Sequence, residues 1–414
     1  MFERLFQLPA TLARHREGPL AQAREQFLLH CAEQGMTHSS LSWLASELLM
    51  ISKRLNIATD GLITQRQIEA AVDQWIRFQR RRGRGGSSRS RKHFVQVASH
   101  WLRFLGRLQL PEPNRFAGMD VIENFIAYMH NERGCSLHTI RTRRKCTERF
   151  LKSFNAQNRP FSEVCIEDID NFLESLGKQN WCRVSIASSA RSLRSFFRYA
   201  GENGWCATNI AAAIRGPRVF KQEGLPLGVN WNDVERLIRS TCENTPRDIR
   251  DKAILQLLVI YGLRRGEVSG LRLEHINWRQ DRISVSRPKQ RCTQEYPLLP
   301  SVGEAILRYL QQVRPPSRYR EIFLTVRAPI QPLSGDGLYD IVRTRLLALG
   351  IRSPHYGPHA LRHACANRMV AQGLSLKEIG DQLGHRSASA TRIYAKVDIA
   401  GLRDVAELSL GGLL

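Results

Sequence analysis

Six side chains in the last third of the chain have types and spacing that suit one reaction, the attack of a tyrosine hydroxyl on a phosphodiester. They are Arg264 in YGLRRGE, Lys289 in RPKQR, His359 and Arg362 in PHALRH, His385 in LGH and Tyr394 in TRIYAK. The transition state of this reaction spreads negative charge over the phosphate oxygens, and fixed cationic donors stabilise that charge. Guanidinium is always charged and grips two oxygens, so Arg264 and Arg362 are the candidates for this role.

Two proton transfers must accompany the attack. A tyrosine is a weak nucleophile while protonated, because its ordinary pKa is about 10. Nearby cations or a base must therefore favour the phenolate, and His359 is a candidate proton acceptor. The departing sugar oxygen needs a proton from a positioned acid, for which Lys289 is the candidate.

The local sequence predicts how these residues are presented. His359 and Arg362 follow Pro358 at a spacing of three, which predicts one face of a helix. His385 follows a glycine at the end of the apolar-periodic segment LKEIGDQLGH, where a helix should stop. The small residues at 388–390 would let the backbone approach DNA closely.

Lys289 lies between two alternating segments, 282–286 and 294–298, which predict a β-hairpin with a basic connection. Arg287 and Arg291 are close competitors for the role of acid, although their high pKa makes them poorer proton donors.

From about Leu225 to its C-terminus the chain resembles the catalytic domain of the tyrosine recombinases, also called the phage integrase family. The resemblance is carried by YGLRRGEVSGLR and GPHALRHACANRMVAQGLSLKEIGDQLGHRSASATRIYAK. It implies a DNA recombinase that needs neither ATP nor a metal ion. It implies the following roles: phosphate binding by Arg264, His359 and Arg362, a hydrogen bond to phosphate from His385, protonation of the leaving 5′ oxygen by Lys289, support of the first arginine by Glu267, and a 3′-phosphotyrosyl link at Tyr394.

Composition agrees with a polyanionic partner. The chain has 414 residues, a formal charge of +24 and a pI near 10.4, and a strongly basic protein most often binds nucleic acid. No apolar run is long enough for a membrane span, and the N-terminus lacks a signal-peptide core. We therefore expect a cytoplasmic protein with no membrane partner.

No metal or other cofactor is expected. The nine cysteines form no CxxC pair and favour reduced thiols. His359 and His363 stand four apart, as in a metal-binding helix, but no glutamate lies between them.

The expected fold is mainly α with a small antiparallel β-sheet, in which helical N-terminal DNA-binding domains precede a mixed α+β catalytic domain at 225–414. A Pro/Gly-containing stretch at 215–228 predicts a linker. Residues 115–216 show three amphipathic helices and resemble the family's SAM-like core-binding domain. Residues 1–112 carry a similar pattern about a hundred positions earlier, which predicts an additional helical domain, either a duplicate of the core-binding domain or an unrelated set of amphipathic helices.

Basic clusters predict further DNA contacts. The segment 79–93 combines charge with glycine and serine, and it is either a solvated loop or a segment that tracks phosphates. The candidate DNA-binding residues are Arg80, Arg81, Arg82, Arg84, Arg141, Arg143, Arg144, Lys145, Arg287 and Arg291.

The partners implied are double-stranded DNA at a recombination site and further copies of this chain, as a dimer on each site and a tetramer in the synapse. Accessory proteins are compatible with this arrangement. The amphipathic segment 401–410 either covers its own core or, as in relatives, docks onto a neighbouring protomer. The extra N-terminal region favours integration or transposition of a mobile element. A type IB topoisomerase-like enzyme and a non-catalytic DNA-binding protein on the same scaffold are the alternatives.

Overall fold

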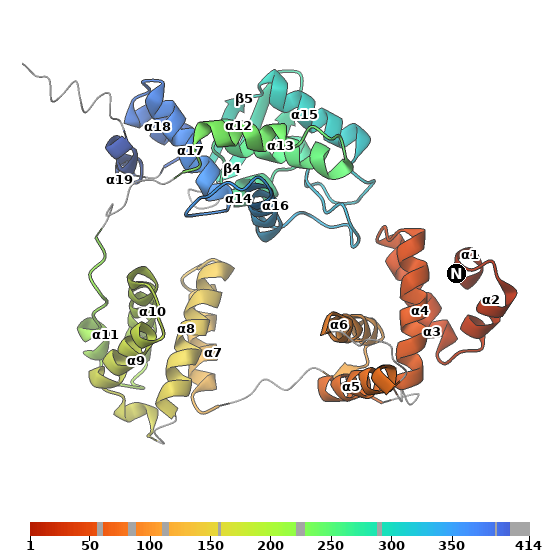
Figure 1. Cartoon of the computed structure of the whole chain (residues 1–414). Coiled ribbons are helices and arrows are strands. Elements are labelled where there is room, and N and C mark those ends of the chain that lie inside the picture. The colour runs from red at the N-terminus through yellow and green to blue at the C-terminus, as the bar shows by residue number, and fades with distance from the viewer. Residues whose placement is uncertain are drawn as a thin grey trace, which may run out of the picture. The chain divides into compact units, whose positions relative to one another are not determined.

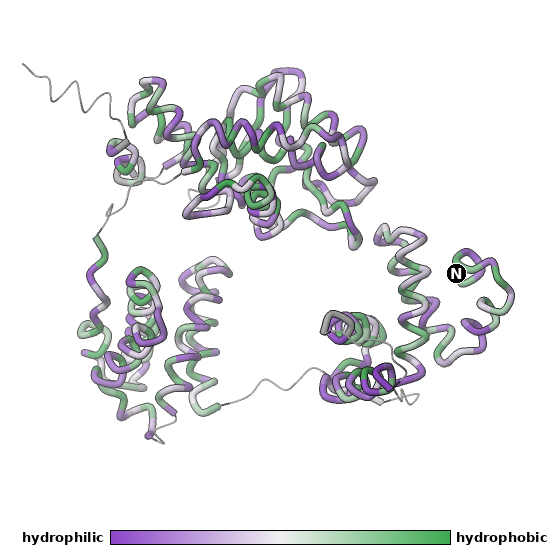
Figure 2. Tube along the Cα trace, in the orientation of Figure 1, coloured by the Kyte–Doolittle hydropathy of each residue, from purple (hydrophilic) through white to green (hydrophobic). Residues whose placement is uncertain are grey.

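The protein is built mainly from helices, as predicted, and its larger sheet is small and antiparallel (Figure 1). The computed structural model describes residues 1–55, 61–81, 88–109, 116–155, 159–220, 228–287, 292–385 and 387–397. Apolar side chains gather in separate cores at 2–102, 122–214 and 229–394. Figure 2 shows the corresponding alternation of hydrophobic and hydrophilic residues along the helices. These cores support the predicted boundaries 1–112, 115–216 and 225–414, which stay a prediction.

The N-terminal part packs its helices around Trp101 and its apolar neighbours, which are buried. Its elements are α1 (Phe2–Leu5), α2 (Pro9–Arg16), α3 (Ala21–Glu33), α4 (His38–Arg54), β1 (Ile63–Thr64), α5 (Gln65–Arg81), α6 (Ser88–Phe104) and β2 (Leu108–Gln109). The sequence did not predict the two short strands, which pair in parallel. They join the segment before α5 to the segment after α6.

The middle part is a second helical unit with its own aromatic core. Its elements are α7 (Met119–Asn131), α8 (Leu137–Asn155), η1 (Phe161–Glu163), α9 (Ile166–Lys178), α10 (Arg183–Glu202) and α11 (Ile210–Ala213). The three amphipathic helices predicted here correspond to α8, α9 and α10. Phe150 and Phe154 of α8 are buried in this core, with Phe150 packed edge-on to Phe172 and Phe197.

The N-terminal and middle parts share an order of four principal helices. In the first part these are α3, α4, α5 and α6, and in the second they are α7, α8, α9 and α10. The helices that correspond in order begin about a hundred positions apart, as the predicted repeat requires. This correspondence supports the repeat, which stays a prediction.

The C-terminal part surrounds the sheet β3–β4–β5 with helices. Its elements are α12 (Trp231–Arg239), α13 (Pro246–Ile260), α14 (Arg265–Ser269), η2 (Leu273–His275), β3 (Ile276–Asn277), β4 (Arg282–Arg287), β5 (Cys292–Pro297), α15 (Pro300–Gln312), α16 (Gly335–Ala348), α17 (Pro358–Ala371), α18 (Leu376–Leu383), α19 (Ala388–Thr391) and η3 (Arg392–Val397). The predicted hairpin corresponds to β4 and β5, which pair antiparallel from Arg282–Pro297 to Arg287–Cys292. No helix in the described part of the chain is long and apolar enough to cross a membrane.

Helix α17 carries His359 and Arg362, and it is held in place by the elements packed around it. It packs against α12, α13, α16, α18 and η3. Pro358 stands at its first turn, where the missing N–H costs no hydrogen bond. Its first half joins the main core, and its second half joins a smaller cluster with α18 and Tyr394. Helix α17 therefore connects the main core to the tyrosine segment.

Arg287 at the end of β4 fastens that strand to the end of α18. The side chain is 1% exposed. It donates to the carbonyl oxygens of Leu383 (2.6 Å) and Gln382 (3.3 Å), to the hydroxyl of Tyr296 and to Glu267 (3.4 Å). The guanidinium of Arg287 is therefore engaged within the protein, and its predicted contact with DNA stays a prediction. The strand pattern located the hairpin, but it could not show that the last arginine of β4 turns into the protein.

Replacing Arg287 with Met should lower the free energy of unfolding by about 2–4 kcal/mol, because buried carbonyl groups and a carboxylate lose a charged donor. Urea unfolding measures the change. Arg282→Met is the matched control on the same strand. Its exposed ion pair with Glu295 (3.1 Å) should contribute little. Equal effects of the two substitutions would contradict the role given to Arg287.

Candidate active site

Arg264 is presented by a tight turn between α13 and α14. Gly262 has φ of 59°, and a Cβ there would lie 2.5 Å from the Leu383 side chain, so only glycine fits. Arg264 then caps α14, where the carboxylate of Glu267 accepts both its backbone N–H and its guanidinium at 2.8 Å. Glu267 is buried, and it contacts the first arginine as the sequence predicted. The Arg264 side chain remains one-third exposed, which leaves it accessible to a ligand.

Arg362 enters the same place from α17. It is 2% exposed and donates to the carbonyl oxygens of Gly262 (2.6 Å) and Leu383 (2.7 Å). Burial lowers the pKa of its guanidinium to about 10, and the neighbouring charge of Arg264 acts in the same direction. The group stays charged at neutral pH, so it offers a fixed cation in a poorly hydrated place.

The end of α18 holds these arginines together. Gly384 has φ of 60° and ends the helix in the left-handed conformation. Its carbonyl accepts from Arg264 at 2.9 Å, while the preceding carbonyl accepts from both Arg287 and Arg362. Glu267 is the carboxylate that pairs with two of the three guanidinium groups. The site therefore carries excess positive charge, which suits a phosphate.

His385 follows this helix end, as predicted. Its Nδ1 lies 2.7 Å from the hydroxyl oxygen of Thr391, a contact that fixes the ring orientation. Burial lowers the pKa of His385 to about 4, and the charges of Arg362 and Arg264 act in the same direction. The imidazole is neutral at pH 7 and can form a hydrogen bond to a phosphate.

Tyr394 packs into the small apolar cluster beside the two arginines. It is 2% exposed, and its neighbours in the cluster include Cys365, Ile379 and Leu383. Burial raises its pKa to about 12, although Arg362 and Arg264 pull the pKa downward. The hydroxyl is therefore protonated in the free protein. Its ring lies beside the guanidinium groups of Arg264 and Arg362. This position is compatible with the predicted role of Tyr394 as the nucleophile.

The sequence reasoning missed the partner of this hydroxyl. The Tyr394 Oη lies 2.9 Å from Nδ1 of His363, one position after Arg362. His359, the predicted proton acceptor, is exposed and packs edge-on against His363 with ring centroids 4.4 Å apart. The signal was present, because a residue four positions after His359 shares its helix face. From the sequence alone, His363 stood out only as a candidate metal ligand.

The structure thus brings together most of the predicted set. Arg264, Glu267, Arg362, His385 and Tyr394 converge, and His359 adjoins them through His363. Lys289 and Arg291 lie outside the described residues.

The other residues predicted to contact DNA are distant from this cluster in the sequence. Arg80 and Arg81 are at the end of α5, and Arg82 and Arg84 lie outside the described residues. On α8, Arg141 and Lys145 are exposed, whereas Arg143 and Arg144 are half-buried and Arg144 pairs with Glu148 at 2.6 Å.

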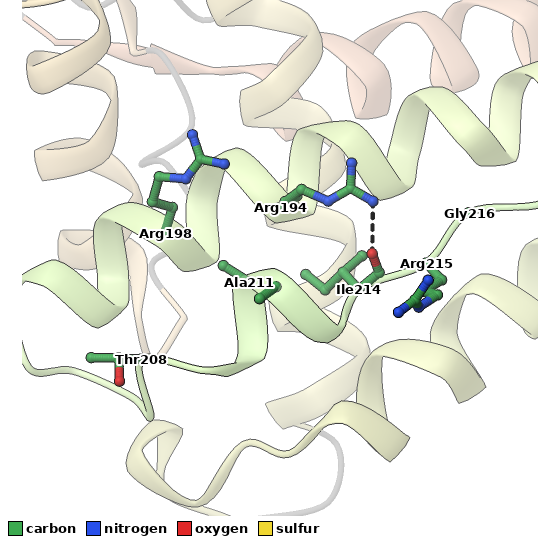
Figure 3. Close-up of a pocket in the computed structure, with 8 residues that line it drawn as sticks. Arg194, Arg198, Thr208, Ala211, Ile214, Arg215 and Gly216 are labelled. Atoms are coloured by element: carbon green, nitrogen blue, oxygen red, sulfur yellow. Dashed lines mark hydrogen bonds between the residues drawn. The ribbon is translucent and has the colours of Figure 1, made fainter.

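The middle part has a basic hollow that the sequence did not indicate (Figure 3). Its volume is about 530 Å³, and arginines from the end of α10 and from the segment after α11 line it. Arg194 is held by the carbonyl of Ile214 at 2.7 Å. Arg198 and Arg215 are exposed, so the hollow presents guanidinium groups to solvent and suits an anion.

Two family models match this chain. Residues 229–400 match the phage integrase family, and residues 122–204 match its N-terminal SAM-like domain. The integrase/recombinase candidate y4rA of Sinorhizobium fredii is 36% identical over 69% of this chain and 69% of its own length. A second such candidate, y4rF of the same organism, is 28% identical and covers 100% of this chain and 96% of its own.

The fold is also that of solved recombinases. The crystal structure of a lambda integrase (75–356) dimer bound to a COC′ core site has a TM-score of 0.54 and 18% identity, covering 66% of this chain and 94% of that one. The arginine pair, the histidines and the C-terminal tyrosine stand within the matched segment. This chain belongs to the phage integrase family, the tyrosine recombinases, which cleave and rejoin DNA.

Proposed function

We propose that this protein is a site-specific DNA recombinase in which Tyr394 attacks the scissile phosphate and forms a 3′-phosphotyrosyl intermediate. The observation that supports this best is the position of the Tyr394 ring beside Arg264 and Arg362, two guanidinium groups held by Glu267 and by carbonyl groups. These fixed cations match the charge that develops on phosphate during attack. Because the phosphotyrosine conserves the energy of the broken bond, rejoining needs no ATP.

The remaining roles follow from position and chemistry. His359 and His385 donate hydrogen bonds to the phosphate, and Lys289 protonates the leaving 5′ oxygen. Glu267 holds Arg264 in place by accepting two hydrogen bonds from it. No step requires a metal ion, because the guanidinium groups supply the positive charge.

We propose double-stranded DNA as the substrate, bound by a dimer on each site and a tetramer in the synapse. The lambda integrase dimer on its core site, which shares this fold, supports the dimer on each site. In the middle part, the exposed basic residues of α8 and the hollow at Arg198 and Arg215 contact the phosphate backbone of the DNA. Accessory proteins are compatible with this arrangement. We propose the cytoplasm as the location of this protein, as expected from the sequence.

We propose integration or transposition of a mobile element as the biological role. The support is the additional helical part at 1–109, which precedes the segments matched by the family models. The S. fredii protein y4rF aligns over the whole chain, so this part also has a counterpart in a relative. Terminal inverted repeats or an attachment site next to the gene would support this role, and their absence would favour resolution of chromosome dimers.

Tyr394→Phe should abolish covalent protein–DNA adducts on a nicked suicide substrate and retain DNA binding, because only the nucleophilic oxygen is removed. Adducts are measured by denaturing gel electrophoresis. Tyr356→Phe is the matched control, because Tyr356 packs against the main core of the same part. This control variant should form adducts at the wild-type rate. Adducts that persist in Tyr394→Phe would overturn the nucleophile assignment. Relaxation of any supercoiled plasmid without a defined site would instead indicate a topoisomerase.

Replacing Arg80, Arg81, Arg82 and Arg84 with Gln should weaken binding to target and random DNA alike. The slope of log affinity against log salt should become shallower by roughly 0.9 for each phosphate that the variant no longer neutralises. Fluorescence anisotropy across a salt series measures it. The control replaces Arg236 and Arg239, which already pair with Asp233 and Glu235 on α12. Unchanged affinity of the fourfold variant at low salt would defeat the phosphate-tracking role.

Ending the chain after Val397 should leave cleavage intact and abolish strand exchange, if the segment 401–410 docks onto a neighbouring protomer as it does in relatives. Adduct formation and recombinant product are measured on the same DNA. Strand exchange that persists with normal cleavage would contradict docking between protomers.

A further inference from the structure

His363 is the side chain in contact with the reacting oxygen. The distance between the Tyr394 Oη and the His363 Nδ1 is 2.9 Å, an ordinary hydrogen bond. The tyrosine ring is buried, so its hydroxyl has little freedom to turn elsewhere. His363 lies on α17 immediately after Arg362, and α17 packs against α13 and α18. The imidazole is therefore positioned by α17 at the hydroxyl of the nucleophile.

The protonation states define the direction of this hydrogen bond. Burial lowers the pKa of His363 to about 4, and His359, Arg362 and His355 act in the same direction. His363 also faces Tyr394 and His385, which are uncharged at pH 7. A lowered pKa means that the neutral form predominates at any pH above about 4, so the ring carries one proton. Because Tyr394 is protonated, its O–H donates, Nδ1 accepts, and Nε2 carries the imidazole proton.

The other two histidines of the site, His359 and His385, have different contacts. His385 directs its Nδ1 to Thr391, and His359 packs edge-on against the His363 ring. His359 is exposed, which leaves it available to a phosphate from outside. In the described part of the chain, the hydroxyl of Tyr394 is hydrogen-bonded to His363. The hydrogen bond therefore favours His363 over His359 as the proton acceptor.

We propose that His363 is a catalytic residue that orients the Tyr394 hydroxyl and takes its proton as the Oη–P bond forms. In that step the P–O5′ bond breaks, the tyrosine proton moves to Nδ1, and the leaving oxygen takes a different proton from the acid assigned to Lys289. During rejoining the 5′-hydroxyl attacks phosphorus, the P–O5′ bond forms and the hydroxyl proton returns to the group assigned to Lys289, while the Oη–P bond breaks and Nδ1 returns its proton to Oη. This proposal rests on the proposed function, because it requires Tyr394 to be the nucleophile.

The two pKa values oppose transfer of the proton from Tyr394 to His363 in the free protein. Tyr394 holds its proton up to about pH 12, whereas His363 accepts one only near pH 4 in the free protein. A phenolate is therefore not formed before DNA binds. The negative charge of the bound phosphate favours the imidazolium, and bond formation to phosphorus acidifies the hydroxyl. Proton transfer accompanies the attack rather than preceding it.

The test measures single-turnover cleavage of a suicide substrate by wild type, His363→Ala and His363→Asn. The alanine variant should lose roughly 100-fold or more in rate, the usual contribution of a general base. The asparagine oxygen can accept the hydrogen bond but not the proton, so His363→Asn should keep DNA affinity and melting temperature while remaining slow. His275→Ala is the control, because His275 lies in η2 of the same part and is not among the groups that act on His363, so this variant should cleave at nearly the wild-type rate.

The pH profile separates proton transfer from a structural role. Cleavage by both His363 variants should rise with pH between about pH 6 and 9, because only solvent hydroxide can then take the tyrosine proton. Wild type should be much flatter over this range. Added imidazole should partly restore His363→Ala. Slow variants that have the wild-type pH profile and no rescue would show a merely structural role and overturn the proposal.

A substrate with a 5′-bridging sulfur provides the last distinction. Sulfur leaves without protonation, so this substrate should restore a Lys289→Ala variant but not His363→Ala. If this substrate restored cleavage by His363→Ala, His363 would be the residue that protonates the leaving group, and the proposal would be overturned. Wild-type rates of His363→Ala and His363→Asn on the normal substrate would also overturn it. If wild type itself formed no adduct, the proposed function would fail instead.

Discussion

The site depends on the binding of three guanidinium groups by the carbonyl groups that end α18. A helix C-terminus leaves its last carbonyls without partners in the helix, and buried carbonyls must find donors elsewhere. Here the donors are Arg264 from the turn before α14, Arg287 from β4 and Arg362 from α17. One helix end thus fixes the relative positions of side chains that lie far apart in the sequence. Because Gly384 also leads directly to His385, the same turn places the histidine.

The excess of positive charge in this arrangement favours the binding of a phosphate but does not favour the stability of the free protein. Three guanidinium groups lie around one carboxylate, Glu267, in a mostly buried place. Burial and mutual repulsion lower the pKa of Arg362 to about 10. Such a cluster is less favourable in the free protein than a balanced ion pair. A bound phosphate would relieve the repulsion, so part of the energy of DNA binding is available at the place where the reaction occurs.

Sequence reasoning succeeded where the signal was local or periodic. It located the hairpin of β4 and β5, the helix that begins at Pro358 and the helix end before His385. It did not indicate that Arg287 is buried, because alternation along a strand cannot show whether a charged side chain finds buried carbonyl groups. It missed the role of His363 for a related reason, since only the fold reveals which of two histidines on one helix face reaches the tyrosine. The parallel pairing of β1 and β2 was also invisible, because it joins two-residue segments far apart in the sequence.

The small cluster around Tyr394 is distinct from the main core of the C-terminal part. Its side chains come from the second half of α17, from α18 and from the tyrosine segment itself. Lifting that segment would break these apolar contacts together with the hydrogen bonds of Tyr394 to His363 and of Thr391 to His385, and it would leave α13 and the sheet intact. The segment that carries Tyr394 is therefore a separable unit of local opening, and the population of the opened form depends on how well this small cluster is packed.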